Sequence, residues 1–144
     1  MLPDEATHLI GTISEKFKKA NHNIYIFSPV LNEYNLIKEL KKIAKKEVNI
    51  TIVTAKTDSL LNRASHLTLF KNISVFTLEA LKNNEKYDNI DLKGSFICID
   101  DKELFLLSDT LDTEALKSHY SFALYQKTSC KKKFNVVLKR STLY

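Results

Sequence analysis

The side chains best suited to chemistry lie between Lys93 and Thr110. Two short apolar runs, residues 96–99 and 104–107, flank a polar turn at 100–103, and this pattern predicts a β-hairpin. Ionisable or hydroxyl side chains stand in the turn and at both outer ends of the hairpin: Lys93, Ser95, Asp100, Ser108 and Thr110. An ammonium group and hydroxyls are suited to holding a phosphate, but they supply no neutral nitrogen nucleophile near neutral pH.

A second group of candidates is the lysine-rich surface. The net charge of +5 comes with twenty lysines and only two arginines. Lysine is a hydrated point charge without the bidentate geometry of arginine, so we expect weak, nonspecific affinity for nucleic acid rather than recognition of a sequence. The alternative is a solvated helix face opposite an apolar stripe. The candidate phosphate-binding residues are Lys93, then Lys41, Lys42, Lys45 and Lys46, and finally Lys131, Lys132 and Lys133.

The remaining reactive residue types give weaker signals. Cys98 and Cys130 are far apart, form no CxxC pattern, and are interpreted as thiols, with Cys98 a small buried one. No histidine pair has metal-ligand spacing with a carboxylate, and two glycines cannot supply a phosphate-binding loop. We therefore expect no metal site and no cofactor.

Length and composition are those of one globular domain spanning residues 1–144. Charged residues make up 27% and hydrophobic residues 44% of the chain. The longest apolar runs fall far short of the roughly 20 residues of a membrane-spanning helix. The first twenty residues contain no signal-peptide pattern, so the expected location is cytoplasmic, with an anchor upstream of Met1 left open.

Hydrophobic periodicity predicts the elements that position these residues. The expected order is a helix over 3–20, a strand at 24–27, a helix from Asn32 to 46, a strand at 50–53, a helix over 58–70, a strand at 73–78, a loop over 79–91, the hairpin, a short helix at 111–117 and a strand at 121–125. The tail, 131–144, fits either helix or strand. This order predicts an α/β fold with a mixed, largely parallel sheet flanked by helices on both faces.

With this order of elements and the hairpin spacing, the chain resembles the phospholipase D superfamily over residues 5 to 126. It is most similar to the small single-domain bacterial nucleases of that family. The family signature is His-x-Lys, four residues, Asp, and then a Gly-Ser pair and an Asn on the next strand. In this chain the six positions carry, in order, Lys93, Ser95, Asp100, Leu107, Ser108 and Thr110.

The resemblance implies an active-site frame that has lost its reactive groups. In the family, two histidines act as nucleophile and general acid, and small members bring the pair together by dimerisation. A protonated lysine at position 93 cannot attack phosphorus, while Ser95 and Thr110 replace the groups that bind phosphate oxygens. Asp100 and Ser108 match the pattern, but the favoured interpretation of Asp100 is a turn residue that bonds local backbone N–H groups, and Ser108 could cap a strand end.

Three functions follow as hypotheses. The first is a catalytically inactive phospholipase D-like domain that binds a protein partner or a second copy of itself, through the hairpin region around Phe96, Phe105 and Leu107. The second is a nonspecific nucleic-acid-binding module that has kept the substrate groove. The third is a phosphodiesterase that uses replacement residues, for which His119 is the candidate nucleophile.

Overall fold

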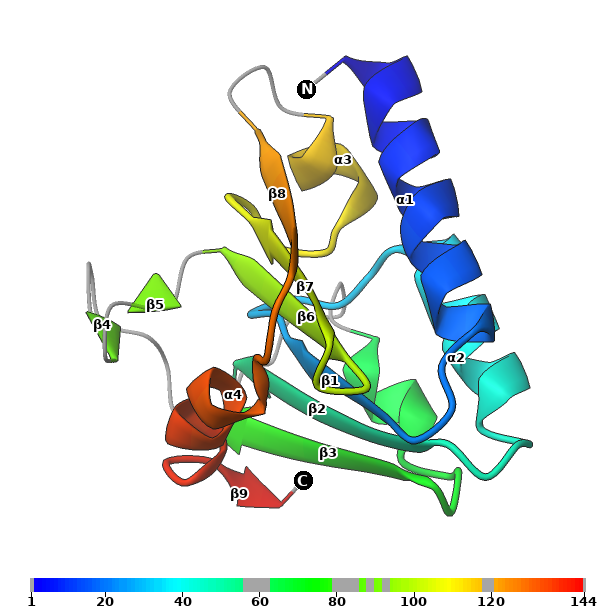
Figure 1. Cartoon of the computed structure of the whole chain (residues 1–144), viewed down its shortest axis with the longest axis vertical. Coiled ribbons are helices and arrows are strands. Elements are labelled where there is room, and N and C mark those ends of the chain that lie inside the picture. Colours follow the sequence, from blue (N-terminus) through cyan, green and yellow to red (C-terminus); the bar gives the residue numbers. More distant parts are fainter. Residues whose placement is uncertain are drawn as a thin grey trace.

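The computed structural model describes residues 2–55, 63–78, 86–87, 90–91, 94–117 and 121–143. Its elements in chain order are α1 (Pro3–Lys18), β1 (Asn23–Phe27), α2 (Tyr34–Ile43), β2 (Asn49–Ala55), the 3-10 helix η1 (Ala64–Leu67), β3 (Ile73–Leu78), β4 (Lys86–Tyr87), β5 (Ile90–Asp91), β6 (Ser95–Ile99), β7 (Glu103–Leu107), α3 (Thr113–Leu116), β8 (Ala123–Lys127), α4 (Lys131–Leu138) and β9 (Thr142–Leu143) (Figure 1).

One seven-stranded sheet organises the fold, in the order β8-β7-β6-β1-β2-β3-β9. The predicted mixed α/β architecture is confirmed, but parallel pairing is limited to β1–β2 and β2–β3. The pairs β8–β7, β7–β6, β6–β1 and β3–β9 are antiparallel, so the sheet is mostly antiparallel rather than largely parallel. Parallel neighbours need a long crossover, which the segments containing α2 and η1 supply for these two pairs.

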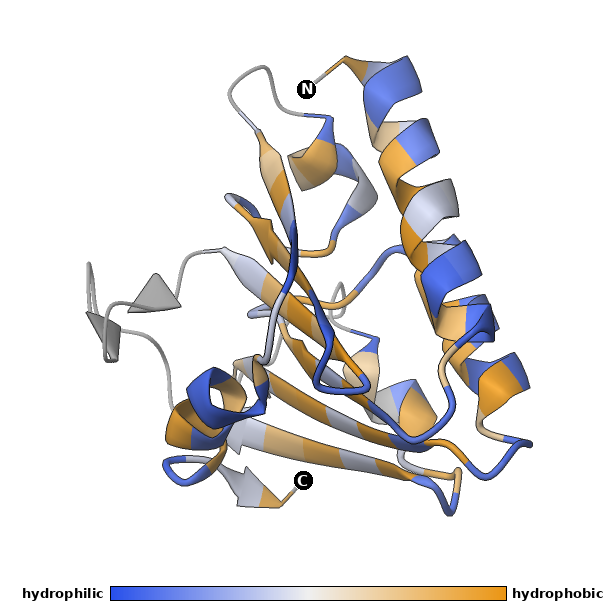
Figure 2. Cartoon of the chain, viewed as in Figure 1, coloured by the Kyte–Doolittle hydropathy of each residue, from blue (hydrophilic) through white to orange (hydrophobic). Residues whose placement is uncertain are grey.

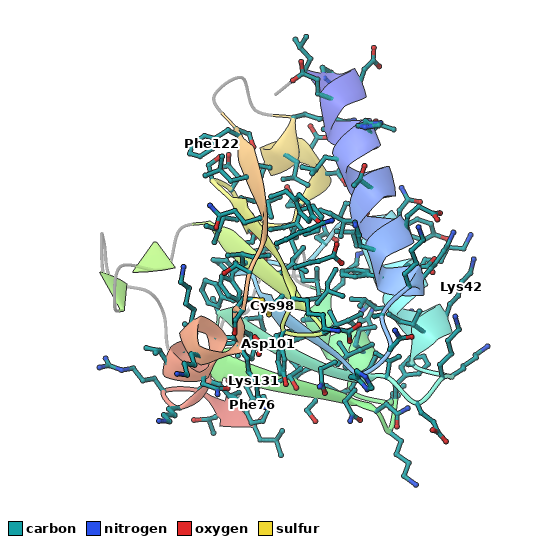
Figure 3. All side chains as sticks on the ribbon, viewed as in Figure 1. Lys42, Phe76, Cys98, Asp101, Phe122 and Lys131 are labelled. Carbon is teal, nitrogen blue, oxygen red and sulfur yellow. A yellow bond between two sulfur atoms is a disulfide. The ribbon has the colours of Figure 1, made fainter. Side chains whose placement is uncertain are left out.

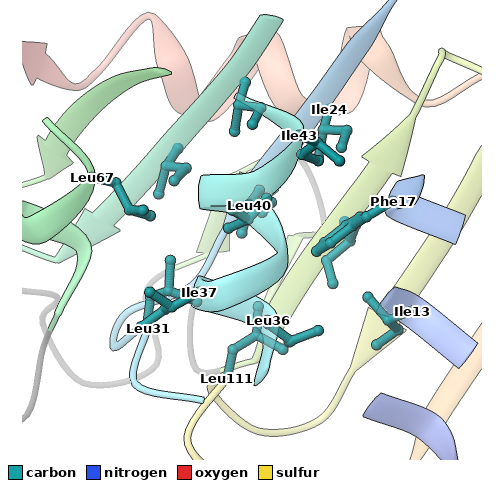
Figure 4. Packing of buried hydrophobic residues seen from close by; sticks show 14 of the residues in the cluster. Ile13, Phe17, Ile24, Leu31, Leu36, Ile37, Leu40, Ile43, Leu67 and Leu111 are labelled. Carbon is teal, nitrogen blue, oxygen red and sulfur yellow. The ribbon is translucent and has the colours of Figure 1, made fainter. Parts of the chain in front are cut away.

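Helices cover both faces of the sheet, as predicted. On one face α1 and α2 place Ile13, Phe17, Leu36 and Leu40 against the strands in the larger core (Figure 4). The hydropathy colouring shows the same stripe along the sheet-facing side of α1 (Figure 2). On the other face α4 covers β1 and β6. The β1 strand is therefore buried on both faces, which explains its continuous apolar run.

The tail resolves into a helix followed by a short edge strand. Phe134 of α4 stacks near Tyr25 and Phe96, with ring centroids 5.1 and 6.3 Å away. A disulfide joins Cys130, which directly precedes α4, to Cys98 of β6, with 5.9 Å between the Cα atoms. The expectation of free thiols was wrong, because the hairpin and the tail meet only in the folded chain.

Two predicted segments fall wholly or partly outside the described residues. Of the helix expected over 58–70, the structure describes η1 and the residues around it, and most of the loop expected over 79–91 is also undescribed. Among the helices that the structure does describe, none is both long and apolar enough to cross a membrane.

Candidate functional site

Three of the five motif residues meet at one end of the sheet. Ser95 begins β6 and pairs with Leu107, the last residue of β7, so Ser95, Ser108 and Thr110 lie close together. Asp100 follows the opposite end of β6, about 16 Å along the strand from Ser95 at roughly 3.3 Å per residue. Lys93 lies outside the described residues. The residues at 95, 108 and 110, here called the motif end, therefore form the candidate site.

Backbone hydrogen bonds occupy the serine hydroxyls of the motif end. Ser95 is buried, and its Oγ donates to the carbonyl oxygen of Asp109. Ser108 Oγ accepts the N–H of Phe122 at 2.8 Å, and the Ser108 N–H donates to the Phe122 carbonyl at 2.9 Å. Ser108 thus extends the β7–β8 ladder by one residue pair. Both serines hold the strand ends together, which is the structural alternative considered for Ser108.

Thr110 forms a hydroxyl pair with Ser28, a residue that sequence reasoning left out of the site. The two hydroxyl oxygens are 2.9 Å apart, and Ser28 is fully buried. Thr110 Oγ1 accepts the N–H of Val30 at 2.8 Å and donates to the Val30 carbonyl, while Ser28 Oγ accepts the N–H of Leu111 at 2.9 Å. These bonds tie the loop after β1 to the chain after β7. The only sequence signal for Ser28 was its position directly after a buried strand.

Asp100 is a structural residue that joins two distant segments. Its carboxylate accepts the backbone N–H groups of Asn21, His22 and Asn23 at 2.9, 2.8 and 3.0 Å. Burial alone would raise the pKa of the Asp100 carboxyl, but these hydrogen bonds outweigh it and hold the pKa below its usual value. The turn-residue interpretation predicted bonds to local backbone N–H groups. The donors are instead far away in the sequence, in the loop after α1 and at the first residue of β1.

The candidate lysines do not form one strip. Lys41 and Lys42 lie in the last turn of α2, and Lys45 and Lys46 lie in the turn that follows it, on the face of the sheet that α1 shares. Lys131, Lys132 and Lys133 form the first turn of α4, which packs on the opposite face. Lys42 and Lys131 accordingly project from different sides of the molecule (Figure 3). A phosphate chain could follow either group, and binding by either one stays a prediction.

The apolar residues proposed for an interface are not accessible. Phe96, Phe105 and Leu107 are at most 4% exposed, because both faces of the central strands are covered. The exposed large hydrophobic side chains of this region are instead Phe122, Leu124 and Tyr125, at 59%, 52% and 42%. Sequence reasoning treated 121–125 as an ordinary strand, and its place at the sheet edge was not readable from its composition.

One further cluster has metal-ligand residue types. Potential ligand atoms of Cys98, Asp101 and Cys130 lie within 4.8 Å of one another. The two sulfurs are bonded to each other, so they are not thiolates, and the Asp101 carboxylate accepts the N–H groups of Cys130 and Lys131, both at 2.7 Å. In this state the cluster fixes the start of α4.

Comparisons with known proteins establish the fold. No family model and no curated protein matches the sequence. Among solved structures, NucT from Helicobacter pylori has a TM-score of 0.83 at 18% identity, over 99% of this chain and 95% of that one. Nuc from Salmonella typhimurium, a phospholipase D family member, has a TM-score of 0.69 at 13% identity, over 92% and 88%.

A third similar structure is that of TrmBL2, an archaeal chromatin protein with a novel mode of DNA binding. Its TM-score is 0.64 at 17% identity, over 92% of this chain and 49% of that one. Together these matches show that the chain has the phospholipase D-like fold. The resemblance expected from the order of elements and the hairpin spacing is thereby confirmed at the level of fold.

Proposed function

We propose that this chain is a phospholipase D-like domain that no longer hydrolyses phosphodiesters and acts as a binding module by associating with a second copy of itself. The observation that carries the loss of chemistry is the use of Ser95, Ser108 and Thr110 in backbone hydrogen bonds at the motif end. A hydroxyl already engaged with the backbone is poorly placed to stabilise charge on a transferring phosphate.

Residue identity at position 93 adds to this argument. The family nucleophile must present a neutral ring nitrogen, which histidine does with a pKa of about 6.5. The ammonium of lysine, with a reference pKa of about 10.4, is protonated at neutral pH and has no lone pair to attack with. Loss of the nucleophile and of the phosphate-binding Lys and Asn together removes most of the known route to catalysis.

A hydrolysis assay tests this part of the proposal. The protein is incubated with a chromogenic phosphodiester and with single-stranded DNA, and we expect no turnover above the buffer blank. The informative variants are His119→Ala and, as a matched control at an exposed histidine of α1, His8→Ala. Turnover that His119→Ala abolishes and His8→Ala preserves would contradict the loss of activity.

Self-association is supported by the edge strand β8. Among the strands that the structure describes, β8 has β7 on one side and no neighbour on the other, so the backbone groups of alternate residues face outward. The N–H of Ser108 donates to the Phe122 carbonyl, and the N–H of Thr128 donates to the Lys102 carbonyl, so the backbone groups of 122 and 128 face β7. Because alternate residues face alternate sides, the backbone groups of Ala123, Tyr125 and Lys127 face outward. An unpaired edge beside exposed Phe122 and Leu124 favours a strand partner.

The lysine in this strand is compatible with a second copy as that partner. In an antiparallel two-fold pairing centred on Tyr125, Lys127 lies opposite Ala123 of the second copy, so the two lysines do not face each other. Phe122 and Leu124 of both copies then lie on the same face of a continuous sheet. This register combines main-chain hydrogen bonds with burial of apolar area.

Sedimentation velocity over a concentration series tests the association. We expect a dimer for the wild type and a monomer for Leu124→Lys, because a charge would replace a contact at the centre of the interface. Leu143→Lys is the matched control, since Leu143 is 66% exposed on β9 at the other edge of the sheet. A monomeric wild type, or a dimer broken by Leu143→Lys but not by Leu124→Lys, would contradict it.

A second candidate function is nonspecific nucleic-acid binding. It is supported by the net charge of +5, by the lysines of α2 and α4, and by the fold likeness to a DNA-binding chromatin protein. Binding to any sequence that weakens steeply between about 50 and 200 mM salt is the expected result. Absence of binding at low salt would remove this function.

A further inference from the structure

A basic cleft lies between α2 and η1, on the face of the sheet opposite α4. Tyr34, Lys38 and Lys41 line it from α2, and Arg63 and His66 line it from η1 and the residue before it. We call this the α2–η1 cleft. The N–H of Arg63 donates to the Leu31 carbonyl at 2.9 Å, which fixes the backbone of Arg63 beside the loop that leads into α2.

We infer that the α2–η1 cleft binds a single strand of nucleic acid, with Tyr34 stacking on a base and Lys38, Lys41 and Arg63 contacting its phosphates. This inference rests on the second function proposed above. It assigns that function to a site on the α2 side, away from the lysines of α4.

The charge in the cleft is not neutralised by any carboxylate that the structure describes. In the part of the chain that the structure describes, no carboxylate pairs with Lys38, Lys41 or Arg63. The nearby carboxylates have other partners. Glu33 is buried and accepts the N–H of Leu36 at 2.7 Å, and Asp112 accepts the Asn32 amide at 3.1 Å and the N–H of Ala115 at 3.2 Å. As far as the described residues go, the cleft thus presents the side chains of two lysines and an arginine to an anionic ligand.

The aromatic residue makes a ligand with bases more suitable than a simple anion. Tyr34 is 64% exposed, although it is a large side chain on an otherwise amphipathic helix. Tyr34, Lys38 and Lys41 recur at i, i+4 and i+7, so they share one helix face over about 10 Å. Proteins that bind single strands without sequence preference combine aromatic side chains, on which bases stack, with cationic side chains that contact the phosphates. The α2 face has both kinds of side chain in one row. The buried side chain of Ile37 adds an apolar wall to the cleft.

The same features disfavour a duplex in this cleft. Bases in a duplex are stacked on one another and expose only their edges in the grooves. A single tyrosine on a helix surface therefore gains its stacking energy only from an unpaired base. A ligand of phosphates alone would use the cations and leave Tyr34 without a role.

Fluorescence anisotropy with a labelled single-stranded oligothymidylate at low salt tests the site. We expect Tyr34→Leu to weaken binding by at least about fivefold, the effect of losing one base stack. Arg63→Gln should weaken binding and lower the slope of log affinity against log salt by about one. Two matched controls lie outside the cleft: Phe122→Leu removes an exposed aromatic ring from beside β8, and Lys102→Gln removes an exposed charge from the β6–β7 turn. Both should change the affinity much less. Lys132→Gln is not a control but tests the lysines of α4 as the rival binding site.

The outcomes separate the site from the function. The cleft assignment fails if Tyr34→Leu binds the oligonucleotide as tightly as the wild type does and Lys132→Gln weakens binding as much as Arg63→Gln. Nonspecific binding by the chain would still stand in that case. The role of Tyr34 in stacking on a base is contradicted if inorganic polyphosphate displaces the labelled strand as well as unlabelled oligonucleotide does. It is also contradicted if a duplex binds as tightly as the single strand and is equally sensitive to Tyr34→Leu. If no oligonucleotide binds at low salt, the function and the cleft fail together. Thermal unfolding of each variant confirms that it is folded.

Discussion

The carboxylates of Asp100 and Asp101, neighbours in the β6–β7 turn, hold two segments that are far apart in the sequence. Asp100 accepts N–H groups from the loop between α1 and β1, whereas Asp101 accepts the N–H groups of Cys130 and Lys131 at the start of α4. Both residues have left-handed backbones, with φ of 53° and 54°. Aspartate tolerates this region better than most side chains, so the same two residues form the turn and anchor its neighbours.

Replacing Asp101 should release the start of α4. Cys130, the residue before α4, has no capping side chain of its own, so Asp101 acts as the helix cap from a distant part of the chain. We expect Asp101→Ala to lower the free energy of unfolding by about 1 kcal/mol, the usual cost of losing a cap. Urea unfolding measures this value. Asp109→Ala is the control, because from the described residues its carboxylate accepts a single 3.3 Å bond, donated by its neighbour Ser108; an equal loss in both variants would contradict the capping role.

The stability contributed by Asp100 should depend on pH in a defined direction. Its pKa is lower in the folded chain than the ordinary value of 3.8, so its contribution is complete above that value and is lost as the pH falls through the folded pKa. Asp100→Asn should therefore be less stable than the wild type at pH 7, by about 1–3 kcal/mol if backbone donors lose their partner. The difference should shrink in strong acid. Unfolding midpoints across this range test the prediction, and a deficit independent of pH would show that ionisation is not involved.

Local patterns in the sequence predicted much of the fold. The apolar face of α2 repeats every three or four residues, and the buried run of β1 has no polar interruption, so both were readable from a short window. The antiparallel pairing of β1 with β6 could not be predicted from a short window, because Ile24 and Ile99 belong to distant segments brought together by tertiary packing. The identity of the tail as a helix depended in the same way on a cap and a disulfide from the hairpin.

The candidate site was predicted less well than the fold. Spacing placed Ser95, Ser108 and Thr110 correctly at one sheet end, but it could not show that their hydroxyls bond to backbone groups. Ser28 was missed because its role depends on the position of Thr110 across the sheet end. Tyr34 was missed because exposure of an aromatic side chain is a property of the folded surface.

The Cys98–Cys130 disulfide should contribute strongly to stability. The bond joins two residues with a sequence separation of 32 and fixes α4 to β6. Disulfides typically contribute about 2–4 kcal/mol to the free energy of unfolding. We expect unfolded wild type to show no free thiols before reduction, and a reductant to lower its unfolding midpoint in urea. The double variant Cys98→Ala/Cys130→Ala should have the lower midpoint with or without the reductant. Two titratable thiols in the untreated protein would contradict the bond.

The disulfide also bears on the cell compartment. Disulfides persist in oxidising environments and are rare where thiols are kept reduced. The pair therefore predicts an oxidising compartment, whereas the sequence alone predicted the cytoplasm, and the location stays a prediction in both cases. Thiol titration of the protein recovered directly from its source, with alkylation at lysis, measures the state in the cell.

The two glycines of the chain should respond to alanine in opposite directions. A Cβ added at Gly94 would lie 2.2 Å from the carbonyl oxygen of Leu107, a backbone atom in the β6–β7 ladder. Gly94→Ala must therefore shift the strands, and we expect a loss of about 1–3 kcal/mol. Gly11 lies on the exposed face of α1 with no atom within 4 Å of such a Cβ, so Gly11→Ala should stabilise the protein by about 0.5–1 kcal/mol. Chemical unfolding of both variants makes the comparison.

The result would also test the geometry of the motif end. Gly94 stands between Lys93 and Ser95, and the absence of a side chain there lets the chain approach the end of β7 closely enough for Ser95 to bond the Asp109 carbonyl. If Gly94→Ala displaces the strand, the amide signal of Asp109 should shift in NMR spectra together with the loss of stability. A stable Gly94→Ala variant with unchanged signals would mean that the strand ends lie further apart, and the engaged hydroxyls on which the loss of catalysis rests would have to be reconsidered.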